Sequence, residues 1–149
     1  MKIKYELEDG AHVPTRAHST DAGFDLYAMK DEIVSFGSPA IVKTGVHMLI
    51  PHGYVGLICP RSGLTQKGIV AEIGVVDAGF TGELQVTVRL EKCRLDASGR
   101  LLPHLEMISK GTRVAQVVVM PIADLELEPG NVSGEITERG SNGYGSTGL

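Results

Sequence analysis

The chain has 149 residues, a formal net charge of −4 and 21% charged residues. This length suits one domain with a sizeable core and is too short for two ordinary domains. The mildly acidic balance argues against broad electrostatic binding to nucleic acid or to an anionic membrane, so any phosphate site must be local. We therefore expect a single domain, residues 1–149, with no nucleic-acid partner.

Neither end of the chain suggests export or membrane insertion. Residues 1–10 lack the apolar run of a signal peptide. The longest nearly apolar run, residues 114–123, is far too short for a membrane span and is interrupted by Gln116. Cys59 and Cys93 have no metal-ligand spacing. These features predict a cytoplasmic protein with no membrane partner.

Short strands dominate the predicted secondary structure, because 19 Gly and 7 Pro divide the chain into short segments. In chain order, segments rich in β-branched residues predict strands over 40–51, 54–60, 68–76, 83–91 and 113–122. In the fourth of these, Leu84, Val86, Val88 and Leu90 alternate with polar residues, as in a half-buried strand. A helix of one or two turns is expected within residues 62–68. The pattern favours an all-β barrel or sandwich.

The C-terminal residues form a distinct, glycine-rich segment. Apolar content falls after Leu127, so residues 128–149 are expected to be a mobile tail that docks on a ligand. Residues 143–148, GYGSTG, match the G-x-G-x-x-G pattern. A dinucleotide-binding fingerprint needs a helix after the glycines, whereas a single residue, Leu149, follows here. The tail instead suits wrapping around a ligand that carries phosphate.

The segment CPRSGL contains a candidate phosphate site. Arg61 offers a planar fork of donors, and Ser62 to Leu64 could open a short helix with free backbone N–H groups. The alternative is a serine N-cap beside a surface arginine. No G-x-x-x-x-G-K-[ST] motif occurs, which argues against a P-loop site.

Carboxylates near glycine-rich turns are candidates for chemistry. Asp77 follows a predicted strand and precedes a Gly-rich turn, so it could take a proton from water beside a bound phosphate, or serve the turn alone. Asp21 and Asp25 suit Mg²⁺ bound together with a triphosphate, or are two loop acids. Gln116, inside an apolar strand, needs a partner: a neighbouring chain, a backbone group or a ligand.

The five histidines show no ligand spacing and are predicted to be surface residues or satisfied core residues. They are His12, His18, His47, His52 and His104.

Five segments in order, AGFDLYA, PRSGL, GVVDAGFTGEL, GTRVAQ and RGSNGYGSTG, resemble the five motifs of the trimeric dUTPase family, the dUTP diphosphatases. The resemblance implies an all-β, jelly-roll-like (β-clip) fold with one short helix and a flexible Gly-rich tail. It also implies a homotrimer whose sites are each shared between three chains. The implied reaction is hydrolysis of dUTP to dUMP and pyrophosphate with Mg²⁺.

The resemblance assigns a role to individual residues. Asp77 would activate the water that attacks the α-phosphorus, and Asp25 would hold Mg²⁺ through water. The residues assigned to substrate binding are Arg61, Ser62, Gly63, Gly74, Val76, Phe80, Gln116, Arg139, Tyr144, Gly145, Ser146 and Thr147. Phe80 would lie against the deoxyribose and Tyr144 would cover the uracil. The 74–82 hairpin would read uracil through main-chain groups.

The sequence departs from the family pattern at Phe80, where tyrosine is commoner, and at Tyr144, where phenylalanine is commoner. Two alternatives stay open. A dCTP deaminase would need a glutamate on the strand after the hairpin, where this chain has Arg89. A regulatory binding protein of the same fold is the other. The connection over residues 93–111 is expected to be a surface hairpin.

Overall fold

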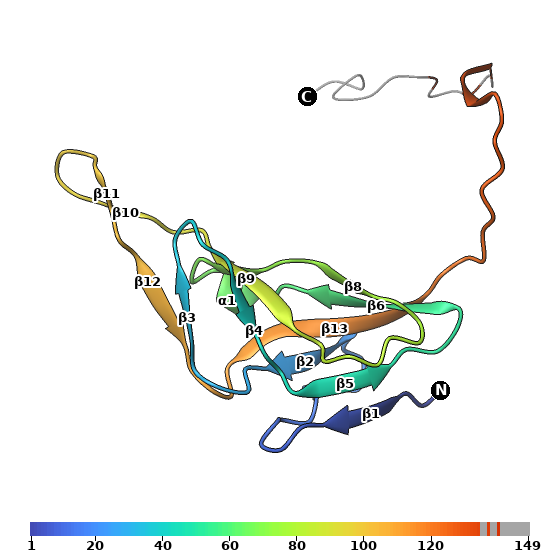
Figure 1. Cartoon of the computed structure of the whole chain (residues 1–149), viewed down its shortest axis with the longest axis horizontal. Coiled ribbons are helices and arrows are strands. Elements are labelled where there is room, and N and C mark those ends of the chain that lie inside the picture. Colours follow the sequence, from blue (N-terminus) through green and yellow to red (C-terminus); the bar gives the residue numbers. More distant parts are fainter. Residues whose placement is uncertain (135–136, 138–139, 141–149) are drawn as a thin grey trace.

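The computed structural model describes residues 1–134, 137 and 140 (Figure 1). The strands are β1 (Lys4–Leu7), β2 (Gly23–Tyr27), β3 (Glu32–Ser35), β4 (Ala40–Val42), β5 (Val46–Leu49), β6 (Tyr54–Cys59), β7 (Ile69–Ala71), β8 (Gly74–Val76), β9 (Val86–Leu90), β10 (Arg94–Leu95), β11 (Leu101–Leu102), β12 (Leu105–Ile108) and β13 (Arg113–Pro121). The helices are α1 (Ser62–Thr65) and the 3₁₀ turn η1 (Val132–Gly134). The predicted all-β fold with one short α-helix is confirmed over the described residues.

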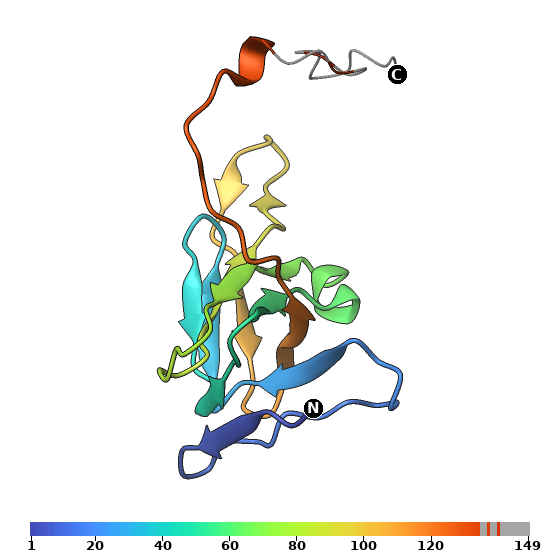
Figure 2. The same ribbon diagram turned by 90° about the vertical axis from the view of Figure 1, so that its right-hand side faces the viewer.

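The strands pair in antiparallel fashion in several small sheets. The largest has the order β2-β13-β6-β8, and a three-stranded sheet has the order β4-β9-β7. Three pairs complete the set: β1 with β5, β3 with β12, and β10 with β11. Apart from the projecting β10–β11 pair, these sheets surround a common interior (Figure 2). This arrangement buries one face of most strands and leaves the other face exposed.

One hydrophobic cluster fills the interior. It includes Leu26 on β2, Val117 on β13, and Val86 and Val88 on β9, and all four residues are inaccessible to solvent. The predicted alternation along residues 83–91 is confirmed, since Leu84 and Leu90 are also buried. The strand itself is shorter than predicted because pairing with β4 and β7 begins at Val86.

Two predicted strands are interrupted. An unbroken strand over residues 40–51 was expected, but Thr44 and Gly45 separate β4 from β5, and Gly45 has a φ of +65°. The Thr44 hydroxyl donates to the Leu84 carbonyl at 2.6 Å. The predicted strand over 68–76 likewise divides into β7 and β8, which pair in different sheets. Local β propensity cannot distinguish one long strand from two that separate.

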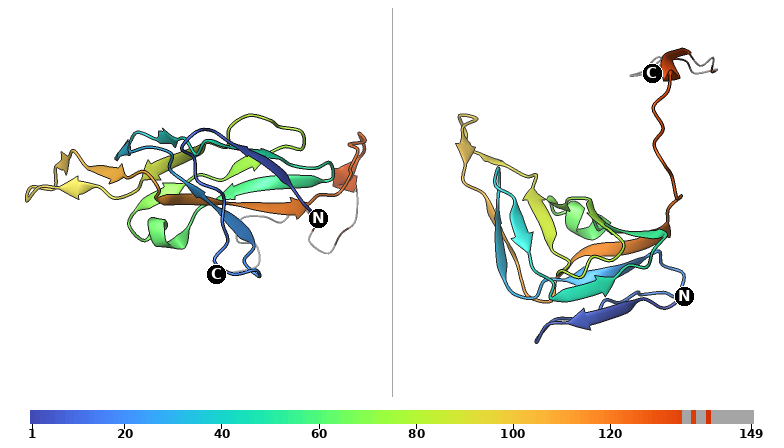
Figure 3. Two further views of the ribbon diagram at one scale, coloured as in Figure 1. Left: turned by 90° about the horizontal axis from the view of Figure 1, so that it is seen from below. Right: turned by 45° about the vertical axis from the view of Figure 1, so that its right-hand side comes forward.

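Two segments project from the body. The connection expected to be a surface hairpin contains the exposed β10–β11 hairpin, and its second half, β12, pairs with β3 (Figure 1). After β13, residues 122–131 contain no strand and lead away from the sheets (Figure 3). Leu125 and Leu127 on this segment are 79% and 100% exposed. None of the described helices has the length and apolar character needed to cross a membrane.

Candidate functional site

Three adjacent strands bring polar residues from distant parts of the sequence into one row. Asp25 on β2 pairs with Gln116 on β13, and Gln116 pairs with Cys59 on β6. The Asp25 residue is 6% exposed, and its backbone N–H donates to the Thr15 carbonyl at 2.7 Å. A carboxylate this buried requires charged or hydrogen-bonding partners. The strand register therefore creates a polar site at this end of the four-stranded sheet.

Two arginines supply those partners. Arg61 forms an ion pair with Asp25 Oδ1, and Arg113 Nη1 donates to Oδ2 at 3.4 Å. Arg61 directly follows β6 and Pro60, which places its side chain beside β2. Burial, and secondarily the positive charge of Arg113, lowers the pKa of Arg61. A guanidinium nevertheless stays protonated at any physiological pH, so both arginines remain cations.

Gln116 completes the row. Its Nε2 donates to the Pro60 carbonyl at 3.3 Å, so the partner that this residue required is a backbone group. Gly23 lies close against the same side chain. The side-chain amide is thereby held between β2 and the start of the Arg61 segment.

A cavity of about 170 Å³ opens in front of this row. Its lining residues are Arg16, Ala17, Asp21, Gly23, Asp25, Arg61, Arg113 and Gln116. Three arginines face two carboxylates there, which leaves an excess of positive charge suited to phosphate.

Arg16 and Arg113 are lining residues that our sequence analysis did not assign to the site. The Arg16 guanidinium lies 4.5 Å from the centre of the Phe24 ring, and its Nη1 donates to the Asp21 carbonyl at 3.2 Å. Arg113 is the first residue of β13 and received no role from the sequence. The sequence signal was a basic residue near a motif for Arg16 and a basic residue within a motif for Arg113, and both are too common to be specific.

Ser62 and Gly63 are exposed on the first turn of α1, directly after Arg61. The alternative of a serine N-cap at Ser62 is wrong, because the N-cap is Arg61 and no side chain caps the helix. The Arg61 carbonyl accepts the N–H groups of Leu64 and Thr65 at 3.1 and 3.0 Å. The helix therefore holds the Arg61 backbone in place while leaving Ser62 and Gly63 accessible.

The 74–82 segment forms the expected bend. Gly74 and Val76 pair with Ile58 and Gly56 of β6, and a turn follows in which the Phe80 N–H donates to the Asp77 carbonyl at 3.2 Å. Asp77 is exposed, and its carboxylate accepts no hydrogen bond from the described residues. The carboxylate is therefore accessible to water and to a ligand.

Phe80 is 46% exposed and lies over Gly82. A Cβ at Gly82 would lie 2.4 Å from Phe80 Cζ, so glycine is required for the ring to take this place. The bend thus carries an exposed aromatic ring three residues after Asp77.

The hairpin and the arginine cavity lie at opposite ends of β6. Asp77 comes one residue after the Val76–Gly56 pair, whereas Arg61 lies five residues beyond Gly56 along the chain. Asp77 and Arg61 are therefore six residues apart along β6, which at roughly 3.3 Å per residue is about 20 Å. Within one chain, Asp77 and Phe80 do not share the cavity with Arg61.

Five residues assigned from the resemblance cannot be located, because they lie outside the described residues. They are Arg139, Tyr144, Gly145, Ser146 and Thr147.

Known proteins resemble this chain over most of its length. A family model described as dUTPase matches residues 9–94. A deoxyuridine 5'-triphosphate nucleotidohydrolase of Mycobacterium marinum is 39% identical, over 95% of this chain and 91% of that protein. The Staphylococcus bacteriophage 80alpha dUTPase with dUPNHPP is 32% identical, with a TM-score of 0.85 over 99% of both chains.

A dUTPase from phage phi11 of S. aureus, described with a structural Mg(II) ion, is 29% identical, with a TM-score of 0.77 over 91% of this chain and 100% of that chain. Sequence identity and fold thus agree along the chain, and the order of the five motifs is explained. The chain belongs to the dUTPase family.

Proposed function

We propose that the protein hydrolyses dUTP to dUMP and pyrophosphate, which would keep uracil out of DNA and supply dUMP for dTMP synthesis. The observation that carries the proposal is the cationic cavity in front of Asp25, built by Arg61 and Gln116 in a chain of the dUTPase family. The relatives described above carry the name of this activity, and one of them was solved with dUPNHPP. The reaction would take place in the cytoplasm.

The phosphate chain would bind along Arg61, Ser62 and Gly63, with Gln116 near the α-phosphate. Arg61 can exchange part of its contact with Asp25 for a bidentate contact with phosphate, since a guanidinium has five N–H donors. Gln116 is already held by the Pro60 carbonyl, so its amide is oriented before substrate arrives. Such preorganisation lowers the cost of ordering the substrate.

The hairpin would supply base recognition and the general base. Main-chain groups between Gly74 and Gly82 would donate to uracil O4 and accept from N3–H. Cytosine reverses both groups and would leave buried backbone atoms unpaired, a penalty that reaches roughly 10⁴-fold. Phe80 would lie against the deoxyribose and exclude a 2'-hydroxyl. Asp77 would take a proton from the water that attacks the α-phosphorus in line with the pyrophosphate leaving group.

The site would be shared between chains of a homotrimer. The separation of about 20 Å along β6 supports a site in which Asp77 approaches the cavity of another chain. Ile73 and Val75, beside and on β8, are 72% and 66% exposed, and a subunit contact would cover them. A third chain would contribute the tail, residues 128–149. In that tail Tyr144 would cover the uracil, and Gly145 would lie between the base-covering and phosphate-binding residues.

Mg²⁺ suits the donors present. No group of three His, Cys, Asp or Glu side chains that could hold a metal occurs among the described residues. Mg²⁺ is instead commonly held by one or two carboxylates, waters and substrate phosphates. Each Asp25 oxygen contacts an arginine but retains a further lone pair for a metal-bound water. Bound there, Mg²⁺ would offset the charge of the triphosphate.

The deaminase alternative finds no support at its key position. Arg89, on the strand after the hairpin, forms an ion pair with Glu72, the residue directly after the neighbouring strand β7. An arginine cannot act as the carboxylate general acid–base that deamination needs.

The test is to incubate the protein with Mg²⁺ and dUTP, dCTP, dTTP or UTP and to identify the products by chromatography. Release of dUMP and pyrophosphate from dUTP alone is expected, with kcat lowered at least ~100-fold in Asp77→Asn. Asp96→Asn, in the distant β10–β11 turn, is the matched control. Ammonia from dCTP would establish the deaminase, and no turnover would favour a regulatory binding role.

A further inference from the structure

The hairpin that carries Asp77 and Phe80 lies along the edge of β5. One end is held by a backbone bond from the Gly79 N–H to the Ile50 carbonyl, at 3.1 Å. The other end is held by a bond from the Leu84 N–H to the Val46 carbonyl, at 2.7 Å. Between these two points the hairpin leaves the strand edge, and a side chain of β5 makes the next contact.

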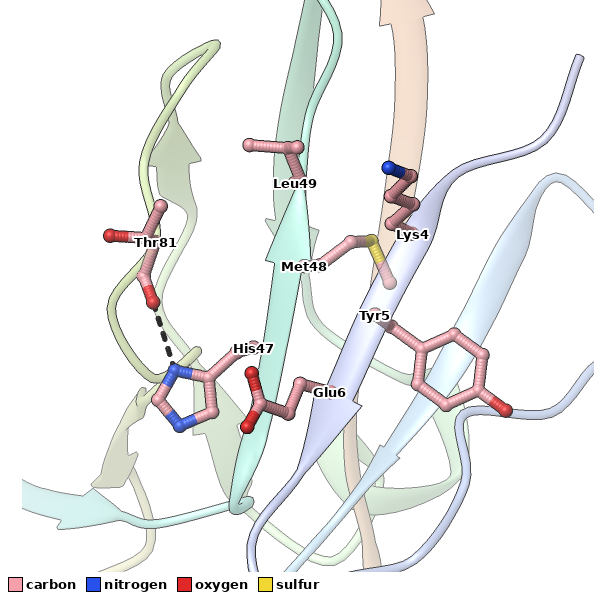
Figure 4. Close-up of a pocket in the computed structure, with 7 residues that line it drawn as sticks. All are labelled: Lys4, Tyr5, Glu6, His47, Met48, Leu49 and Thr81. Atoms are coloured by element: carbon pink, nitrogen blue, oxygen red, sulfur yellow. Dashed lines mark hydrogen bonds between the residues drawn. The ribbon is translucent and has the colours of Figure 1, made fainter.

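That side chain is His47. Its Nδ1 lies 2.9 Å from the Thr81 carbonyl oxygen, at the middle of the hairpin (Figure 4). Its Nε2 lies 3.4 Å from Glu8 Oε1, just after β1. The imidazole thus bridges the N-terminal strand and the hairpin across β5. It also lines a pocket of about 310 Å³ with Thr81 and residues of β1 and β5.

We propose that His47 is a positioning residue that holds the substrate hairpin on β5 through Thr81, and that its doubly protonated form does so best. The proposal rests on the proposed function, because it concerns the hairpin assigned to uracil and to the attacking water. His47 touches neither the nucleotide nor the reacting atoms; it acts through the hairpin backbone.

Both nitrogens of the His47 ring face acceptor oxygens. A neutral imidazole has one N–H, so it can donate to the Thr81 carbonyl or to Glu8 but not to both. The imidazolium donates to both. The Thr81 carbonyl is the main cause that raises the pKa of His47 above its ordinary value of 6.5. Burial opposes this shift, and the Glu8 carboxylate adds to it. The bridging form therefore persists to higher pH than an unperturbed imidazolium would.

Other charged groups around the ring act in the same direction overall. Glu6 is the β1 residue directly paired with His47, and its carboxylate also raises the pKa. Lys4, farther along β1, lines the same pocket with its positive charge. Glu83 forms a bridge with His47 on the hairpin side, but its carboxylate accepts the N–H groups of Thr44 and Gly45. Acidic groups thus outnumber basic ones near the imidazole.

The raised pKa of His47 sets the direction in which pH changes the hairpin contact. A raised folded-state pKa means that the stabilising contact is complete below pH 6.5 and is lost as pH rises through the folded pKa. Loss of one donated hydrogen bond loosens the hairpin before substrate binds, so KM for dUTP should rise, by about fivefold. kcat should change less than twofold, because the bound nucleotide itself orders the hairpin.

The experiment measures kcat and KM for dUTP between pH 5.5 and roughly pH 9 in the whole protein at saturating Mg²⁺. His47→Asn is the main variant, since the asparagine amide can reach the place of Nδ1 and donate to Thr81 without titrating. Glu8→Gln removes the carboxylate that favours protonation. His52→Asn, at an exposed histidine, is the matched control.

The wild type and the His52 control should show the rise in KM at high pH. In His47→Asn that rise should be absent, and in Glu8→Gln it should move to lower pH. The terminal phosphate of dUTP also titrates near neutrality, so the difference between the variants carries the test. An unchanged KM profile in both His47→Asn and Glu8→Gln would overturn the proposal.

A second measurement does not depend on turnover. NMR titration should give a His47 pKa above 6.5 that falls in Glu8→Gln, with the Thr81 and Gly82 amide shifts following the same curve. A titration of His47 that leaves those amides unmoved would also overturn the proposal. If dUTP is not hydrolysed but the amides follow His47, the proposed function fails while the contact stands.

Discussion

Gly23 and Gln116 are in close contact across β2 and β13. A Cβ on residue 23 would lie 2.5 Å from Gln116 Oε1 and 3.0 Å from its Cβ and Cδ. Gly23→Ala should therefore push the Gln116 amide away from the Pro60 carbonyl. We expect a loss of about 1–3 kcal/mol in the free energy of unfolding, from overpacking, together with a raised KM for dUTP.

Urea unfolding and steady-state kinetics measure these two effects. Gly130→Ala is the matched control for stability, because a Cβ there would meet nothing within 4 Å. A urea midpoint equal to wild type in Gly23→Ala would show that Gln116 relaxes without cost.

Arg61 neutralises a carboxylate that is nearly inaccessible to solvent. The Asp25 side chain is 9% exposed, and Arg61→Ala would leave it with the longer contact to Arg113. We expect this variant to lose about 2–4 kcal/mol of unfolding free energy, because a buried charge loses its nearest partner. It should also lose most of its activity towards dUTP.

The double variant Arg61→Ala/Asp25→Asn separates these effects. It should recover much of the lost stability, as measured by urea unfolding, since the uncompensated charge is gone, while activity stays low. Equal stability of the single and double variants would argue that the ion pair contributes little.

Phe80 should control discrimination between dUTP and UTP. Its ring lies over Gly82, and truncation in Phe80→Ala would open space beside the sugar of a bound nucleotide. The ratio of kcat/KM for UTP to that for dUTP should rise by about 10-fold or more, as measured with both nucleotides in competition. Phe36→Ala, at another exposed phenylalanine, should leave the ratio unchanged. A ratio that does not change in Phe80→Ala would assign sugar selection to another group.

Glu83 should make the fold sensitive to acid. Burial alone would raise its pKa, but the Gln85 amide, the Gly45 and Thr44 N–H groups and the Lys43 charge outweigh burial and hold the pKa below 4.5. A depressed folded-state pKa means that this stabilisation is present above pH 4.5 and is lost as pH falls through the folded value.

Glu83→Gln should therefore lower the free energy of unfolding at pH 7 by about 1–3 kcal/mol and flatten its decline in acid. Urea unfolding at neutral and acidic pH tests both effects. Glu91→Gln, at an exposed glutamate, is the control. An acid decline as steep as that of wild type in Glu83→Gln would assign the decline to other carboxylates.

Strand periodicity and turn chemistry are local properties, and the sequence determined them well. The alternation from Leu84 to Leu90 correctly identified a half-buried strand, because side chains on a strand alternate between two faces whatever the strand pairs with. The glycines and Asp77 likewise correctly predicted the bend after Val76. The ordered motifs also pointed to the correct family, since each motif is a contiguous segment.

Pairing between distant segments was decided by the tertiary structure. Asp25 and Gln116 are neighbours because β2 and β13 pair in one particular register, and no local pattern specifies that register. The same pairing brings Arg113 to Asp25, while the loop before β2 brings Arg16 to the cavity. Neither a basic residue near a motif, Arg16, nor one within a motif, Arg113, revealed these contacts in the sequence.

His47 shows most clearly which contacts the sequence alone does not predict. From the sequence it was one of five histidines without ligand spacing, predicted to be a surface or satisfied residue. Its contacts with Thr81 and Glu8 arise because β5 lies between β1 and the hairpin. Local sequence thus determined the strands and turns of this protein. The packing of strands far apart in the chain decided which charged groups and hydrogen-bond donors meet. The energies of ion pairs and hydrogen bonds depend on distances between groups, and these distances exist only in the folded state.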